Sequence, residues 1–189
     1  GVNLLGGRAR IRNLHPFSAS ELGRAFDLDR ALNHGLLPGI WFSDDPEEDL
    51  SAYVSLYLEQ EILQEGATRN LPAFSRFLEG AALSSGGQIN YQSIASDAQA
   101  ARSTVQEYFK ILKDTLLARE VPVWRKGKSR KTVETSKFYL FDTGVARRLQ
   151  GRKRLAQGTA EYGTAFEHWV LHELSAYADA CRRDAEIAY

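Results

Sequence analysis

The sequence contains no methionine and only one cysteine, Cys181. A single thiol cannot form an internal disulfide, and it provides too few soft ligands for a structural zinc site. No apolar stretch approaches the roughly 20 residues that span a bilayer, and the N-terminus lacks the charged-then-apolar layout of a signal peptide. We therefore predict a cytoplasmic protein with no membrane association. Because position 1 is glycine and methionine is absent, we also expect the chain to be part of a longer gene product.

The chain has no net charge, because 24 basic residues balance 24 acidic residues. The basic and acidic residues are nevertheless unevenly distributed along the sequence. Residues 98–154 contain 15 basic and 5 acidic residues, a net charge of +10. Such a segment suggests a polyanionic partner such as DNA, because each cation that neutralises a phosphate releases condensed counterions. The alternative is a solvated basic face that keeps the protein soluble.

The spacing of apolar residues predicts a mainly α-helical protein of the α+β class. Ser18 and Glu21 have the spacing of a capping box, as do Ser103 and Gln106, so a helix is expected to begin at each. Longer helices are expected over residues 49–65, 71–83, 103–117 and from 163 onwards, with short ones over 89–96 and 145–149. The expected apolar stripe of 71–83 consists of Phe74, Phe77, Leu78 and Ala82, and that of 103–117 consists of Val105, Tyr108, Phe109, Leu112 and Leu116. Short strands are expected at 8–14 and at the C-terminus from 186. On the last long helix, the expected core residues are Phe166, Trp169, Val170, Leu174 and Tyr177.

Residues 68–150 have the element order of a winged helix. Three helices are followed by a strand over 118–124, a polar tract over 125–131 and a second strand over 137–141. The tract and the start of the second strand have a net charge of +5, where the wing of such a domain usually contacts the DNA backbone. A solvated hairpin is the alternative, because lysines on exposed strand edges also discourage aggregation.

The DNA-contacting residues are therefore expected on the third helix and on the wing. Cations on both elements would position the phosphate backbone, while Thr104 and Gln106 could contact base edges in the major groove. The candidates on the helix are Arg102, Thr104, Gln106, Lys110 and Lys113, and those on the wing are Arg125, Lys126, Lys128, Arg130 and Lys131.

Three other patterns indicate no site. Gly127-Lys128-Ser129 resembles the end of a phosphate-binding loop, but position 122, where the first glycine should stand, is proline. His168 and His172 are four residues apart, but the order is not H-E-x-x-H and no third ligand is evident, so we expect ordinary surface histidines and no metal site. The acidic cluster at 44–49 is typical of the start of a helix, where negative charge interacts favourably with the positive end of the helix dipole.

Several segments together resemble bacterial and archaeal AAA-type ATPases that carry a C-terminal domain of unknown function. The matching segments are residues 4–8 (LLGGR), 14–18 (LHPFS) with Glu21-Leu22, 35–38 (GLLP), 57–62 (YLEQEI), Thr104-Val105 with Tyr108, 137–144 (KFYLFDTG) and 163–174 (GTAFEHWVLHEL). One departure is Gln60-Glu61, where members of that family often have Arg-Asp. Each segment alone is a weak match, but their order and spacing make the resemblance more specific. Together they cover nearly the whole chain.

The resemblance implies three regions. Residues 1–67 would be the tail of the ATPase domain with connecting helices, and 68–150 the winged helix. Residues 151–189 would be a connector and the truncated start of a domain similar to the PD-(D/E)xK nuclease fold. In that fold a helix glutamate precedes further metal ligands, and only Glu167 matches here. ATP and magnesium would be bound by the missing N-terminal domain, so no cofactor is expected in this chain.

The leading hypothesis is thus a non-catalytic fragment of an AAA-type ATPase whose winged helix binds DNA. One alternative is a fragment of a metal-dependent nuclease. Another is a module that binds a partner protein or self-associates, since winged helices also serve as protein-binding modules.

Overall fold

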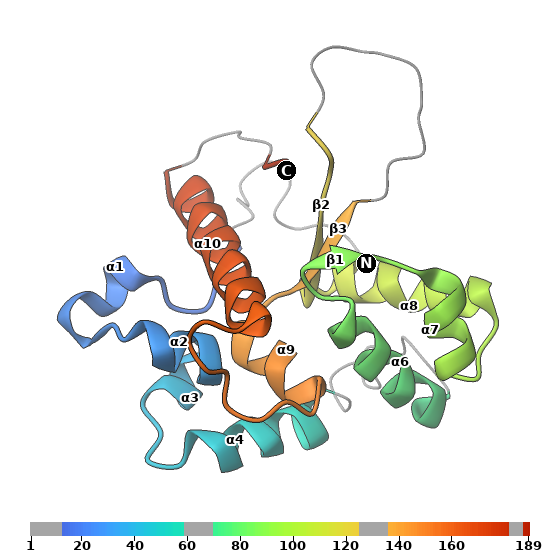
Figure 1. Ribbon diagram of the computed structural model, residues 1–189, viewed down its shortest axis with the longest axis horizontal. Helices are drawn as coiled ribbons and strands as arrows, with labels where there is room; N and C mark the ends of the chain where they lie inside the picture. Colours follow the sequence, from blue (N-terminus) through green and yellow to red (C-terminus); the bar gives the residue numbers. More distant parts are fainter. Residues whose placement is uncertain (1–12, 59–69, 125–135, 182–186) are drawn as a thin grey trace, which may run out of the picture.

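The computed structural model describes residues 13–58, 70–124, 136–181 and 187–189. The fold is mainly helical with one small sheet, as predicted (Figure 1). The strands are β1 (Gly87–Gln88), β2 (Ala118–Val121) and β3 (Lys137–Leu140). The helical elements are α1 (Ala19–Leu22), the 3-10 turn η1 (Gly23–Ala25), α2 (Leu28–His34), α3 (Pro38–Trp41), α4 (Pro46–Ala52), the π-helical segment η2 (Tyr53–Leu58), α6 (Leu71–Leu83), α7 (Tyr91–Asp97), α8 (Arg102–Asp114), α9 (Thr143–Leu149) and α10 (Ala160–Ala180).

The three strands form an antiparallel sheet in the order β1-β3-β2. Successive residues of a strand point to opposite faces, so Phe138 and Leu140 share one face while Tyr139 lies on the other. Phe138 and Leu140 belong to the core that α6, α7 and α8 form. Tyr139 packs with Val121 and with Leu171 of α10. The sheet therefore lies between α10 and the helices α6–α8, as Figure 1 shows.

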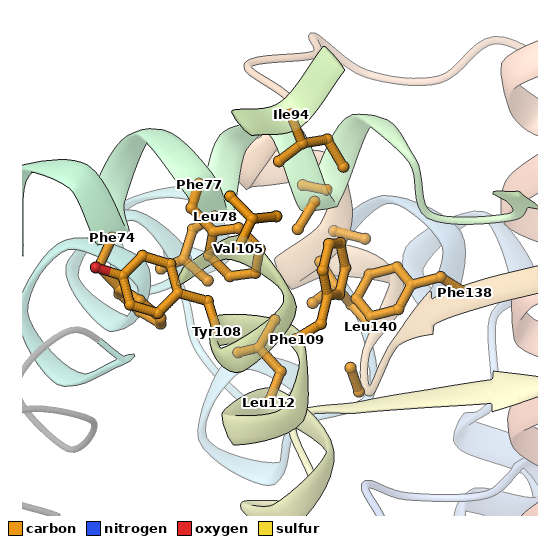
Figure 2. Close-up of a cluster of buried hydrophobic side chains, with 14 of the residues drawn as sticks. Phe74, Phe77, Leu78, Ile94, Val105, Tyr108, Phe109, Leu112, Phe138 and Leu140 are labelled. Atoms are coloured by element: carbon orange, nitrogen blue, oxygen red, sulfur yellow. The ribbon is translucent and has the colours of Figure 1, made fainter. Parts of the chain in front are cut away.

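The main hydrophobic core is built around aromatic rings from three elements (Figure 2). The ring of Phe77 in α6 lies 4.9 Å from that of Phe109 in α8, which lies 4.9 Å from that of Phe138 in β3. Both pairs meet edge to face, the geometry that the charge distribution of aromatic rings favours. The same core includes Ile40 and Leu50, which precede the predicted winged-helix region. The proposed domain boundaries remain predictions.

The apolar stripe predicted for α6 is confirmed, and that for α8 is confirmed except at Leu116, which lies beyond the end of α8 and is 62% exposed. In α8, the buried residues are Val105, Tyr108, Phe109 and Leu112. The predicted capping box at Ser18 is also present, because Ser18 accepts from the Glu21 amide while Glu21 accepts from the Ser18 amide. The predicted cap at Ser103 is wrong, since α8 begins one residue earlier and Ala101 precedes it without a side-chain cap.

Our prediction of which face of α10 is buried is largely wrong. Phe166, Leu174 and Tyr177 are 42%, 51% and 55% exposed. The buried residues are instead His168, Leu171, His172 and Ser175. Each of these polar side chains hydrogen-bonds to a carbonyl oxygen, of Leu140, Phe17 and Leu171 respectively. Satisfied polar groups can be buried at little cost, so the buried face of α10 combines hydrogen-bonded polar residues with the apolar Leu171.

Several predicted segments fall partly or wholly outside the described residues. These are most of the strand at 8–14, the helix beyond residue 58 and the polar tract at 125–131. At the C-terminus, the Tyr189 amide donates to Pro122 O at 3.0 Å and its carbonyl accepts from Trp124 N at 2.8 Å. This pair of bonds has the pattern of parallel strands. Within the described ranges, no helix is both long enough and apolar enough to cross a bilayer.

Candidate nucleic-acid interface

The predicted recognition helix, α8, has one buried and one exposed side. It packs on α6 and α7 through Val105 and its apolar partners, and α7 and α8 are joined by residues 98–101. Gln99 in this turn has a φ of 51°, which allows the Ala100 amide to bond back to Ala95 O at 3.0 Å. This turn connects the two packed helices, and the side of α8 that faces away from α6 and α7 is exposed.

Four of the five candidates on α8 share this outer side. At roughly 100° per residue, Arg102, Gln106, Lys110 and Lys113 fall within about 80° of one another around the helix axis. Arg102, Gln106 and Lys110 are exposed. Thr104 lies roughly 200° from Arg102, at the opposite border of the helix, and is half-buried. The structure therefore brings the cations and Gln106 together and separates Thr104 from them.

The charge of Lys113 is already paired within the fold. Its Nζ lies 3.0 Å from Oε1 of Glu120 on β2, so this ion pair joins α8 to the strand that follows it. Exposed Glu107 and Asp114 on the same helix further offset its positive charge. Arg102 and Lys110 are thus the α8 cations that lie open to a ligand.

The wing candidates Arg125, Lys126, Lys128, Arg130 and Lys131 lie outside the described residues. The strands that the tract connects are described. Val121 at the end of β2 lies opposite Lys137 at the start of β3. The two strand ends that the basic tract connects therefore lie side by side in the sheet.

Glu167, the nuclease-motif candidate, is held by the sheet. Its Oε1 lies 2.6 Å from Lys137 Nζ and accepts a hydrogen bond from the Tyr139 hydroxyl. Burial raises the pKa of Tyr139, and the bond to Glu167 adds to that rise. Burial opposes ionisation of Glu167, but these two donors lower the pKa of its carboxyl overall. No group of three possible metal-ligating side chains is found among the described residues.

His168 and His172 are not the surface histidines that we predicted. His168 Nε2 lies 2.6 Å from Leu140 O, and His172 Nε2 lies 3.0 Å from Phe17 O. Because a carbonyl only accepts, each Nε2 carries a proton. Burial lowers the pKa of His168 to about 4, so its ring is neutral at pH 7. The two residues fasten α10 to β3 and to the segment before α1.

One polar residue that we did not predict is Arg119 of β2. It lies opposite Tyr139 in the register and therefore on the sheet face that meets α10. A signal was available, because residues two apart in a strand share a face and Arg119 is two residues before the apolar Val121.

A family model described as a domain of unknown function (DUF8612) matches residues 25–156. The chain belongs to the DUF8612 family. The match extends from the last residue of η1 to the connection before α10 and includes all three strands and α8. The DUF8612 fold as seen here therefore includes both the helices α2–α4 and the sheet with α6–α9.

Two curated relatives are the uncharacterized proteins Rv2008c of Mycobacterium tuberculosis and Mb2031c of Mycobacterium bovis. Each is 26% identical over 178 residues, which cover 91% of this chain and 40% of the relative. The chain thus spans about two fifths of the length of these relatives. No solved structure matches the chain.

Proposed function

We propose that residues 68–150 form a winged helix that binds DNA. The observation that carries this proposal is the exposed stripe of Arg102, Gln106 and Lys110 on the second helix of a helix-turn-helix pair. A recognition helix contacts DNA from such an uncovered side, with cations on phosphates and an amide on base edges. The topology α6-β1-α7-α8-β2-β3 with the sheet order β1-β3-β2 also supports it.

The wing would supply most of the charge. The tract between β2 and β3 contains five lysines and arginines, whereas α8 offers only two open cations. The tract connects the end of β2 with the start of β3, which lie side by side in the sheet. Phosphate contacts there would fix the position of the domain on the duplex, and Gln106 would contribute any base preference.

The parent protein would be an AAA-type ATPase. The resemblance of the sequence to that family supports this, and the curated relatives are long enough to carry a further domain. ATP and magnesium would then be bound outside this chain. The nuclease alternative gains no support from Glu167, because Lys137 and Tyr139 engage its carboxylate.

A second candidate function is self-association through α10. Phe166, Leu174 and Tyr177 fall within about 80° of one another on the helix surface, and all three are exposed. Exposed apolar stripes often mark protein contacts. Sedimentation velocity over a range of concentrations would test this, with Leu174→Glu expected to abolish any dimer.

The DNA-binding proposal is tested with two matched double variants and a fluorescent 25-base-pair duplex. Arg102→Ala with Lys110→Ala removes two charges from α8. The control, Arg24→Ala with Lys153→Ala, removes two exposed charges from elsewhere. Fluorescence anisotropy should show affinity reduced about tenfold by the first variant and much less by the second. Equal losses in the two variants would mean that α8 is not the contacting element.

A further inference from the structure

A cavity of about 440 Å³ lies between β2, α10 and residues 13–16. This volume is within the range of small-molecule sites, which are mostly apolar with a few placed polar groups. Its apolar lining includes Leu14, Leu116, Pro122, Phe141, Leu171 and Ile187. Its polar lining includes Asn13, His15, Arg119, Glu120, Ser175 and Asp179.

Arg119 is the cation of this cavity. It is half-buried on the sheet face that meets α10, and burial lowers the pKa of its guanidinium. Two other cations near the sheet form ion pairs with carboxylates: Lys113 pairs with Glu120, and Lys137 pairs with Glu167. Within the described ranges, Arg119 has neither an ion pair nor a hydrogen bond from its side chain. A half-buried guanidinium with no carboxylate of the described chain paired to it is a suitable donor for an anion from outside the chain.

The two carboxylates that line the cavity are occupied by other groups. Glu120 Oε1 lies 3.0 Å from Lys113 Nζ. Asp179 Oδ2 lies 2.6 Å from His15 Nε2 and 3.3 Å from Asn13 Nδ2. Asp179 attracts Arg119 electrostatically without forming an ion pair with it. A ligand carboxylate could therefore approach Arg119 without displacing an existing contact.

The apolar part of the lining includes a strained residue. Leu116 has a φ of 62°, a left-handed conformation that is unfavourable for a branched side chain, and it is 62% exposed. Its turn connects α8 to β2 and leaves its side chain uncovered beside the cavity. An apolar group bound there would remove Leu116 from water and contact Phe141 and Leu171, which line the same cavity.

We propose that this cavity binds a small organic carboxylate with an apolar body. The guanidinium of Arg119 would take the carboxylate, in the two-point geometry that arginine favours. Leu116, Phe141 and Leu171 would cover the apolar body. The site would lie on the sheet face that meets α10, and binding there does not depend on whether α8 contacts DNA.

The test uses octanoate, with octanol and acetate as probes that each lack one half of the proposed ligand. Isothermal titration into the full chain should give clear binding of octanoate, at least tenfold weaker binding of octanol and no detectable binding of acetate. Arg119→Met should weaken octanoate binding at least tenfold while leaving octanol binding unchanged. Equal affinities for octanoate and octanol would overturn the proposal, as would absence of octanoate binding at millimolar concentration.

A second variant keeps the test informative if Arg119→Met does not fold. Leu116→Gly removes part of the apolar wall at a position whose φ favours glycine, so it is expected to fold at least as well as the parent chain. Octanoate should bind it several-fold more weakly. Unchanged octanoate affinity in Leu116→Gly would contradict the proposed placement of the apolar body.

Discussion

The carboxylate of Asp142 accepts a hydrogen bond from the Leu36 amide at 2.7 Å and another from the Val145 amide at 3.0 Å. Asp142 thereby caps α9 and also holds the residues that follow α2 against the start of α9. Thr143 adds a bond from its hydroxyl to Ala31 O at 2.6 Å. Burial raises the pKa of Asp142, and the backbone amides oppose that rise. The segment 142–144 is thus the junction between the N-terminal helices and the sheet unit.

Replacing Asp142 with asparagine should destabilise this junction. The amide oxygen could still accept from Val145, but the amide nitrogen would face the Leu36 N–H, leaving that donor unsatisfied. We expect a loss of about 2 kcal/mol in the free energy of unfolding, measured by urea denaturation. Asp44→Asn, at an exposed position, is the control and should change stability by less than about 0.5 kcal/mol. Equal stability of the two variants would show that the junction contributes little.

Gly144 should be intolerant of any side chain. A Cβ there would lie 2.3 Å from the backbone carbon and oxygen of His34, so α2 and α9 would have to separate. Gly144→Ala should therefore cost more than about 3 kcal/mol or prevent folding. Gly163→Ala in α10 meets no atom within 4 Å and should stabilise the protein by about 0.5–1 kcal/mol. Thermal denaturation of both variants checks this, and a stable Gly144→Ala protein would show that α2 and α9 are not packed as described.

Acid should destabilise the fold through His168. Its pKa is lowered to about 4, below the ordinary value of 6.5, so the unfolded chain takes up the proton first as the pH falls. The free energy of unfolding should fall between about pH 6.5 and pH 4, by up to about 3 kcal/mol. His168→Gln keeps a donor near Leu140 O but cannot titrate. Urea denaturation across this range should show a shallower pH dependence for the variant, and parallel curves would contradict the assignment to His168.

Lys137 and Glu167 should stabilise one another across the β3–α10 contact. A double-mutant cycle with Lys137→Met and Glu167→Gln should give a coupling of about 1 kcal/mol or less, since Glu167 is half exposed, and added salt should reduce it. The pair of Arg154 with Asp29 is the comparison, because its arginine is largely exposed. Its coupling should be smaller, and a larger one would mean that burial does not set the strength of these pairs.

The sequence predicted best where apolar spacing decides the structure. Val105, Tyr108, Phe109 and Leu112 recur at three and four, and burying them in one core requires the helix that is observed. It failed for α10, because the carbonyls that satisfy His168 and His172 belong to segments distant in the chain. No pattern in the sequence near His168 or His172 indicates that these carbonyl oxygens lie within reach.

The candidate site was predictable only in part. Helical spacing alone places Arg102, Gln106 and Lys110 on one stripe and Thr104 away from it. The pairing of Lys113 with Glu120 depends on how the chain turns between α8 and β2, and that turn contains the left-handed Leu116. A leucine gives no sequence signal for such a conformation.

The salt dependence of DNA binding tests the central proposal most directly. If the winged helix neutralises about five phosphates, the logarithm of the binding constant should fall with the logarithm of salt concentration at a slope of about −4 to −5. Alanine at the four wing positions Lys126, Lys128, Arg130 and Lys131 should reduce the magnitude of this slope. An unchanged slope in that variant, or no binding by the parent chain at low salt, would contradict the account.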